Sequence, residues 1–317
     1  MTGRLVAGYS REVPGYPASP AVDTALFNTA VFDAANWQAR EAQHQDRADT
    51  LSLERRERAA AGRTHPVDDF LFTYYPFRPG LLRRWHPGSG ARLRGAAGAE
   101  RAGWKWYRTE GDDVLVDDAA FRDRNARSIR FIVTLLDRTA ARPANFSCFG
   151  LHEWAMVYRQ DEHRHVAPLR LGQGDTDDVV DAHSISCSHF DAFRFFTPAA
   201  LDHNALQPTR ENQPRLEQPG CLHAGMDVYK WVIKLGPLIP GELLLDSFEL
   251  ARDIRRLDMQ ASPYDLSEWG YAPVAIETPA GKAEYVRRQR DLADRSNALR
   301  ARAIAAVGAL PSDQPRV

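Results

Sequence analysis

Residues 221–258 contain two helical patterns joined by a short turn, and this feature constrains the fold most. The run CLHAGMDVYKWVIKLG predicts a helix that ends near Gly236, and a second helix is predicted from about Glu242 to Asp258. The connecting run PLIPG predicts a tight turn, so the two helices form an αα-hairpin. We therefore expect a helical, bundle-like core that contains this hairpin.

Helical periodicity recurs elsewhere in the chain. One apolar stripe, which includes Phe121, Ile129, Ile132 and Leu136, predicts a core-facing helix. At about 166–200, β-branched and aromatic residues predict a small β-containing insertion. The expected fold is therefore mainly α with a small inserted β-sheet, of the α+β class. The other predicted helices run from about Asp23 to Ala61, about Asp117 to Ala141, about Leu151 onward and about Lys282 to Val307.

Composition limits the kind of protein that the chain can be. Hydrophobic residues make up 44% and charged residues 26% of the 317 residues, as in folded globular proteins. No apolar run approaches the roughly 18 residues of a membrane-spanning helix. The first twenty residues lack the apolar stretch of a signal peptide, and three cysteines are too few for a disulfide framework. We expect a single cytoplasmic domain over residues 1–317, and leave its oligomeric state open.

The charge balance gives no general attraction to nucleic acid. Lys and Arg number 41, and Asp and Glu number 42, so the net charge is -1 and binding to phosphates requires a local patch. The best candidate is the arginine-rich stretch from Arg78 to Arg94, in which Trp85 can stack on a base. The alternative is an exposed loop whose arginines balance acidic helices elsewhere.

His152 and Glu153 are polar residues in the otherwise apolar run CFGLHEWAMVYR. Adjacent helical residues point about 100° apart, so we do not expect these two to ligate one metal together. A buried glutamate has a raised pKa and can serve as a general acid or base. The alternative is a structural carboxylate paired with an arginine.

The run HSISCSHFD contains an H-x-D step, His189 and Asp191. On a strand these residues would project from the same face. Together with His223 they would supply the two histidines and one carboxylate of a non-haem Fe(II) site.

His223 begins a helical face that also carries Asp227 and either Lys230 or Lys234. A histidine, a carboxylate and an ammonium group on one face form a candidate general acid-base site, and a surface ion-pair ladder is the alternative. We expect Asp227 to be a surface-like, exposed carboxylate, which contributes little to stability, so Asp227→Asn should leave the fold intact while removing most activity.

Several aromatic and histidine side chains are candidates for binding a planar substrate, and core packing is the alternative for the aromatic ones. These candidates are His152, Trp85, Tyr229, Trp231 and His183.

Five runs, HPVDDFLFTYY, CFGLHEWAMVYR, SHFDAFRFFTP, QPGCLHAGMDVYKW and IETPAGKAEYV, resemble a family of actinobacterial proteins commonly labelled 3-methyladenine DNA glycosylase. The resemblance covers most of the chain from about Phe27 to Arg290. It implies an N-glycosidic hydrolase that removes a damaged purine from DNA or from a nucleoside-like small molecule. In this interpretation Asp227 or Glu153 is the working carboxylate, His223 and Lys230 position the substrate, and no cofactor is needed.

Two other interpretations remain open. One is a non-haem iron-dependent oxygenase that acts on a small molecule and holds Fe(II) with His189, Asp191 and His223. The other is a ligand-binding or scaffold protein without catalysis.

Overall fold

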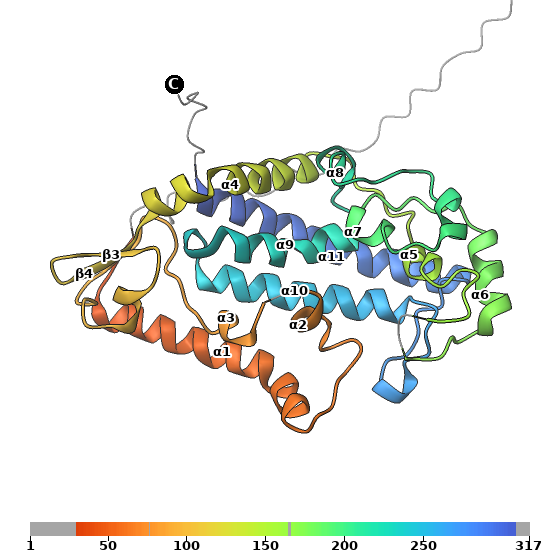
Figure 1. Ribbon diagram of the computed structural model, residues 1–317, viewed down its shortest axis with the longest axis horizontal. Helices are drawn as coiled ribbons and strands as arrows, with labels where there is room; N and C mark the ends of the chain where they lie inside the picture. The colour runs from red at the N-terminus through yellow and green to blue at the C-terminus, as the bar shows by residue number, and fades with distance from the viewer. Residues whose placement is uncertain (1–29, 76, 164–165, 309–317) are drawn as a thin grey trace, which may run out of the picture.

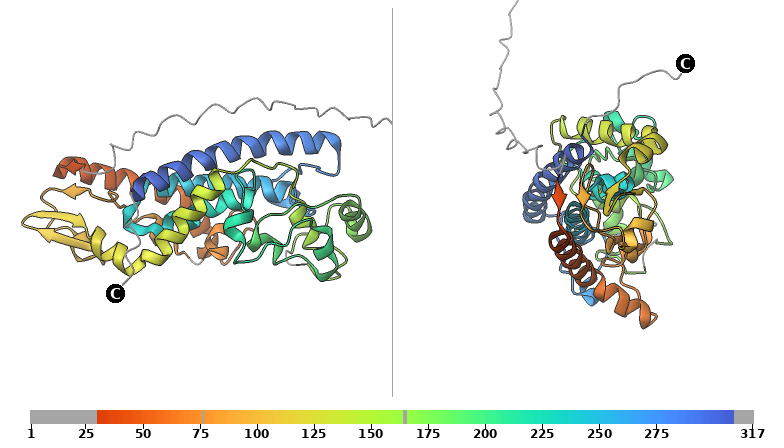
Figure 2. Two further views of the ribbon diagram at one scale, coloured as in Figure 1. Left: turned by 90° about the horizontal axis from the view of Figure 1, so that it is seen from above. Right: turned by 90° about the vertical axis from the view of Figure 1, so that its left-hand side faces the viewer.

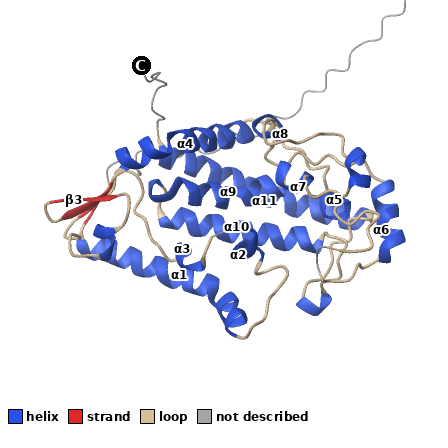
Figure 3. Ribbon diagram, viewed as in Figure 1, coloured by secondary structure: helices blue, strands red, loops and turns tan. Residues whose placement is uncertain are grey.

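In a computed structural model, the chain is described over residues 30–75, 77–163 and 166–308. Helices dominate, and one small sheet lies at an end of the molecule (Figure 3). The predicted mainly helical α+β class is therefore confirmed. The α-helices are α1 (Ala34–Ala60), α2 (Phe70–Tyr74), α3 (Pro79–Leu82), α4 (Asp118–Ala140), α5 (Leu151–Ala155), α6 (Gly172–Asp181), α7 (Phe190–Phe193), α8 (Gln213–Leu216), α9 (Leu222–Leu235), α10 (Gly241–Gln260) and α11 (Pro279–Val307). Short 3-10 helices are η2 (Glu100–Gly103), η3 (Pro198–His203), η4 (Gly236–Leu238) and η5 (Ser267–Trp269).

The core is built around α9, which packs against α10 and α11. These helices run along the long axis of the molecule (Figures 1 and 2). Only Lys230, Ile233 and Lys234 of α9 are not buried, and a helix that is buried almost all round lies at the centre of its fold. At Gly225 a Cβ would come within 2.6 Å of Ser296 Oγ and 2.9 Å of Ile254 Cδ1, so the close approach of the three helices requires glycine there.

The predicted αα-hairpin is confirmed by α9 and α10. Gly236 ends α9 with φ +55°, a conformation that glycine adopts without strain. The predicted apolar stripe on α4 is also confirmed, since Phe121, Ile129, Ile132 and Leu136 are buried. The α11 helix covers the predicted C-terminal helix and begins three residues earlier than Lys282, with Thr278 as its N-cap.

The first long helix starts later than predicted. It was expected from about Asp23, but α1 begins at Ala34 because Asp33 caps it by accepting a hydrogen bond from the Asn36 N–H. Residues 23–29 of the predicted helix lie outside the described residues. Arg47 of α1 pairs with Glu249 of α10 at 2.7 Å, which ties α1 to the hairpin.

The sheet is not where the sequence placed it. Its strands are β1 (Val31–Phe32), β2 (Arg92–Leu93), β3 (Tyr107–Glu110) and β4 (Asp113–Val116), in the order β1-β2-β4-β3. The β1/β2 pair is parallel, and the β2/β4 and β3/β4 pairs are antiparallel.

The predicted insertion at about 166–200 contains α6 and α7, and only isolated bridges occur near it, such as Ile185 with Asn204. The prediction was wrong because Val179 and Val180 form the buried face of a helix, a position that favours apolar residues as strongly as a strand does. In the described part of the chain, no helix has the length and apolar character needed to cross a membrane.

Candidate functional site

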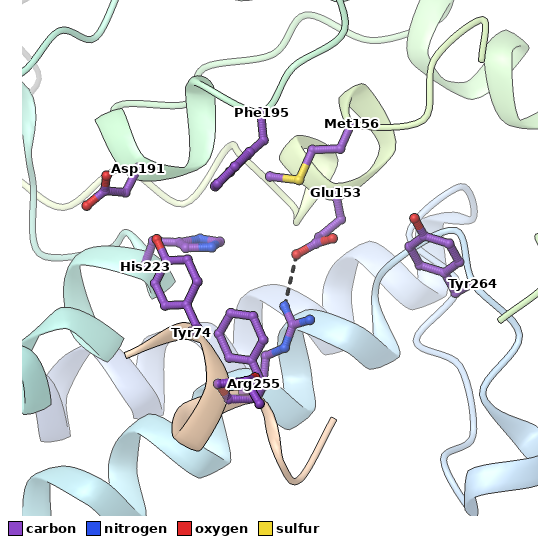
Figure 4. A pocket seen from close by; sticks show the side chains of 10 residues that line it. Tyr74, Glu153, Met156, Asp191, Phe195, His223, Arg255 and Tyr264 are labelled. Carbon is purple, nitrogen blue, oxygen red and sulfur yellow. Dashed lines mark hydrogen bonds and ion pairs between the residues drawn. The ribbon is translucent and has the colours of Figure 1, made fainter. Parts of the chain in front are cut away.

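A cavity of about 320 Å³ opens between α2, α5, α7, α9 and α10. Its volume is that of a small-molecule site. Figure 4 shows its side chains arriving from segments far apart in the sequence. The cavity is lined by Phe70, Thr73, Tyr74, Glu153, Met156, Asp191, Phe195, His223, Arg255 and Tyr264.

A sharp turn before α5 places its side chains at this cavity. Phe149 and Gly150 both have left-handed backbones, with φ of 49° and 76°. A Cβ at Gly150 would lie 3.3 Å from Ala261 Cβ, so glycine allows the turn to sit against the end of α10. Trp154 Nε1 then donates a hydrogen bond to the Ala261 carbonyl at 2.9 Å. His152 and Glu153 are thereby fixed beside the last turns of α10.

Five buried side chains, His152, Glu153, His223, Arg255 and Asp258, form what we call the open centre. His152 Nε2 lies 2.8 Å from Asp258 Oδ1. Arg255 Nη1 donates to Glu153 Oε1 at 3.0 Å and to Asp258 Oδ2 at 3.2 Å. The His223 ring packs edge-on against the His152 ring, with centroids 4.5 Å apart. The centre faces the cavity through Glu153, His223 and Arg255.

Burial and charge pairing set the protonation of the open centre. Burial disfavours charge on His152, but the Asp258 carboxylate outweighs it and raises the pKa of His152 well above its usual value. Burial opposes ionisation of Asp258 as well, but His152 and Arg255 hold the pKa of Asp258 below its usual range. Burial raises the pKa of Glu153, and Arg255 offsets part of that rise.

His223 differs from its neighbours because burial lowers its pKa to about 3, so the ring is neutral near pH 7. Within the described residues its nearest charged partner is Asp258 Oδ2 at 4.0 Å, and its ring nitrogens make no hydrogen bond. A neutral imidazole without a hydrogen bond, at the wall of a cavity, is available to bind a ligand or a metal.

A second group of buried side chains, Tyr75, His189, Glu217 and Asp227, together with the largely buried Lys230, forms what we call the closed network. Tyr75 donates to Asp227 Oδ1 at 2.7 Å, and His189 Nε2 lies 3.2 Å from Asp227 Oδ2. Lys230 Nζ donates to the same Oδ2, and His189 Nε2 is 3.4 Å from Glu217 Oε1. Asp227 is thus held by three donors of the protein itself.

The charges of the closed network reinforce one another. Burial disfavours the ionised form of Asp227, but Lys230 and His189 hold its pKa below the usual range. Burial also disfavours charge on Lys230, but Asp227 raises the pKa of Lys230 above its usual value. We therefore assign Asp227 and Lys230 to a buried ion pair.

The four predicted catalytic residues are divided between these two groups. Glu153 and His223 line the cavity, whereas Asp227 and Lys230 belong to the closed network and do not line it. The expectation that Asp227 is exposed was wrong, because its side chain is only 2% exposed. Lys234, the alternative to Lys230 on the predicted helical face, lines a different cavity at the far end of α9.

Of the predicted substrate-binding residues, only His152 lies in the open centre. Trp85 is buried in a separate apolar cluster near the sheet, with Nε1 3.4 Å from Glu242 Oε1. Tyr229 packs against Tyr75, with ring centroids 5.7 Å apart. Trp231 packs against Phe131, and His183 Nδ1 lies 2.6 Å from the Val179 carbonyl oxygen. The rings of Trp85, Tyr229 and Trp231 therefore pack in the core, as the alternative interpretation of these residues held.

The predicted metal set of His189, Asp191 and His223 does not come together. His189 turns into the closed network, Asp191 pairs with Arg210 at 3.2 Å, and His223 joins the open centre. The reason is that His189 caps the short α7 helix and Asp191 lies inside it, so the i, i+2 rule for strands does not apply.

The structure instead brings together the donor atoms of His152, Glu153, His223 and Asp258, all within 4.8 Å of one another. The donor atoms of His152 and Glu153, which we did not expect to serve one metal together, thus lie close enough to do so. The donor atoms of His189, Glu217 and Asp227 form a second set with the same spacing.

Arg255 and Asp258 are the site residues that the sequence did not assign. A signal was present, because both continue the buried face of α10 that includes Ala251 and Ile254. Charged residues on an apolar helical stripe indicate buried partners or a functional role. The partner of Asp258, however, is His152, which is 106 residues away in the sequence.

Comparisons with family models, with curated proteins and with solved structures found no match to this chain.

Proposed function

We propose that the chain is a metal-dependent enzyme of the non-haem iron type that acts on a small molecule bound in the cavity. The observation that carries this proposal is the set of donor atoms of His152, Glu153, His223 and Asp258, which lie within 4.8 Å of one another. Two imidazoles and a carboxylate are the ligands of non-haem Fe(II) oxygenases, whose remaining coordination positions stay open.

The residues present fit such an ion. His223 offers a neutral ring that makes no hydrogen bond in the described part of the chain, as a ligand nitrogen requires. His152 Nε2 lies 2.8 Å from Asp258 Oδ1, and an ion bound between them would displace the proton that this contact holds on His152. Asp258 Oδ2 is held by Arg255. Such an outer hydrogen bond orients a ligating carboxylate. His152, His223 and Asp258 would therefore hold the ion, and Fe(II) bound there supplies the activation of oxygen.

The other residues of the cavity bind the substrate and control water and protons. Glu153 is fixed through Oε1 by Arg255, and its raised pKa suits an exchange of a proton with the substrate. The Arg255 guanidinium in turn stacks 3.8 Å from the Phe70 ring centroid, which shields it from water. Tyr74 and Phe195 supply flat apolar walls for the substrate.

Anaerobic reconstitution with Fe(II) tests this proposal. We expect near-stoichiometric iron in the wild type, and oxygen uptake that a chelator abolishes. His152→Ala should lose both, while the control His183→Ala, a half-buried histidine outside the cavity, should keep both. Iron binding that is equal in the two variants would refute the proposal.

A second candidate is an N-glycosidic hydrolase that acts on damaged DNA or on a nucleoside. The observation that favours it is Glu153, a carboxyl group with a raised pKa in a cavity lined by Phe70, Tyr74 and Phe195. A flipped base would stack on such rings while the carboxyl group assists cleavage. The resemblance to the 3-methyladenine DNA glycosylase family supports this candidate, with Glu153 in preference to Asp227.

Release of free base from methylated DNA and from methylated nucleosides, by protein treated with chelator, tests the hydrolase. Activity that survives the chelator and is lost in Glu153→Gln would favour the hydrolase over the iron enzyme. The free thiols of Cys148, Cys187 and Cys221 suit a reducing compartment, and for either activity we propose the cytoplasm.

A further inference from the structure

A second cavity of about 320 Å³ lies at the opposite end of α9, near the sheet. Ile233 lines this cavity, whereas His223 lines the first, and the two residues are ten positions and about 15 Å apart along the helix. The cavity is therefore distinct from the proposed active site. Its wall includes Gly236 and Gly241, at the turn of the αα-hairpin (Figure 1).

The charged side chains that line this second cavity are all positive. Arg84, Lys105 and Lys234 line it, and no aspartate or glutamate does. In the described part of the chain, none of these three cations forms an ion pair. The end of α9 and the start of α10 meet here with opposing dipoles, so side chains decide the sign of the local potential.

A neutral histidine adds a polar group to the cavity. His86 Nδ1 lies 2.7 Å from the Tyr107 hydroxyl oxygen, which leaves Nε2 for a ligand. Burial, with a smaller contribution from the guanidinium groups of Arg101 and Arg84, lowers the pKa of His86 to about 3, so the ring is neutral near pH 7. Arg101 is itself paired with Glu41, so among the described residues the unpaired positive charge at the cavity comes from Arg84, Lys105 and Lys234.

The apolar wall is formed by aromatic rings. Trp106 and Phe121 meet edge to face with centroids 5.4 Å apart, and Lys105 Nζ lies 4.4 Å from the Trp106 ring centroid. Trp106 has φ 73°, a left-handed conformation that is strained for a bulky residue. Such strain is concentrated at binding sites, where the surrounding structure holds a side chain in place.

We propose that this second cavity binds a small phosphate monoester with a flat ring, the chemical class of a mononucleotide. Lys105, Lys234 and Arg84 would bind the phosphate, and the aromatic corner would contact the ring. We expected the stretch from Arg78 to Arg94 to be a candidate patch for binding the phosphates of nucleic acid. In this proposal, only part of this stretch contacts a phosphate. Trp85 is buried and Arg83 pairs with Asp49 at 2.9 Å, so Arg84 and His86 are the polar side chains of this stretch that line the cavity.

Calorimetric titration of the full chain with AMP, adenosine and inorganic phosphate tests the proposal. We expect AMP to bind at one site, more tightly than either adenosine or phosphate. Lys105→Glu and Lys234→Glu should each weaken AMP binding by about tenfold, because each reverses a charge at the phosphate. Both lysines are exposed, so the fold should tolerate these changes, and thermal melting checks that it does.

Two controls locate the site. Arg138→Glu reverses an exposed charge on α4 away from the cavity and should leave AMP binding unchanged. His223→Ala should also leave it unchanged, because His223 belongs to the other cavity.

The proposal would be overturned by any of four results. These are no binding at millimolar AMP, equal affinity for adenosine and AMP, unchanged affinity in both charge reversals, or loss of binding in His223→Ala. Binding of a single-stranded oligonucleotide without binding of AMP would also overturn it and indicate a strand-binding surface.

Discussion

The open centre and the closed network are built from the same residue types but differ in how their polar atoms are satisfied. They are neighbours on α9, where His223 and Asp227 are one turn apart, and the rings of His189 and His223 lie 5.4 Å apart. In the closed network both oxygens of Asp227 accept hydrogen bonds from protein donors. In the open centre His223 accepts none and lines a cavity.

This difference separates structural from functional polar groups. Burying a charge is costly unless it is paired, and the closed network supplies its own pairs. His223 lines a cavity without a hydrogen bond within the described residues, so a ligand or metal can reach it, whereas His189 Nδ1 of the closed network is buried without a partner and lines no described cavity. We therefore expect changes in the closed network to reduce stability and changes in the open centre to reduce metal binding.

The largest effect is expected for Asp227→Asn, which removes the negative charge of the closed network. Lys230 would remain largely buried with its main partner neutralised, and breaking a buried pair in this way costs about 3 kcal/mol. Urea unfolding of the variant should show this loss, and Asp191→Asn should lose less, because the other ion-pair partners of Asp191, Arg194 and Arg210, are exposed. An unchanged unfolding midpoint would show that Asp227 contributes as little to stability as an exposed carboxylate.

The second largest effect is the stabilisation of the folded state by metal. Fe(II) under anaerobic conditions at about 100 times its dissociation constant should add about 2.7 kcal/mol, which raises the melting temperature by about 5 °C. The shift should be absent in His223→Asn. A shift of equal size in that variant would assign the metal to another site.

Regions formed by contacts between residues close in the sequence were predicted better than regions formed by contacts between distant residues. The hairpin, α4 and α11 were predicted because a periodic apolar stripe is a local signal. The strands are two to four residues long, too short to show an alternation, so the sheet was misplaced.

The site was predicted only in part for a related reason. His152, Glu153 and His223 were identified as polar residues within apolar runs. Their grouping with Asp258 depends on the turn at Phe149 and Gly150, and His189 was assigned to the wrong group because α7 is a helical turn. Which of two neighbouring networks a histidine enters is decided by tertiary packing, which no local pattern encodes.

The pH dependence of stability sharpens the comparison further. The pKa of Asp227 in the folded state is below its usual value of 3.8, so its stabilising effect is complete above that pH and is lost as the pH falls through the lower folded value. The difference in unfolding free energy between wild type and Asp227→Asn should therefore shrink as the pH is lowered from about 6 toward about 2. A difference that stays constant would mean that the folded and unfolded pKa values of Asp227 are equal.

The smallest effect on stability is expected for His223→Asn. Since the His223 ring makes no hydrogen bond within the described residues, its replacement should cost less than about 1 kcal/mol in urea unfolding. A loss comparable to that of Asp227→Asn would show that His223 is a structural residue like those of the closed network.

The central claim, that the open centre and not the closed network holds the metal, is tested most directly by metal analysis of His223→Ala and His189→Ala after anaerobic reconstitution with Fe(II). The two histidines are neighbours, each in one of the two donor sets, which makes the variants a matched pair. We predict that His223→Ala loses the iron and that folded His189→Ala retains it. Iron retained in His223→Ala, or lost only in His189→Ala, would contradict the account.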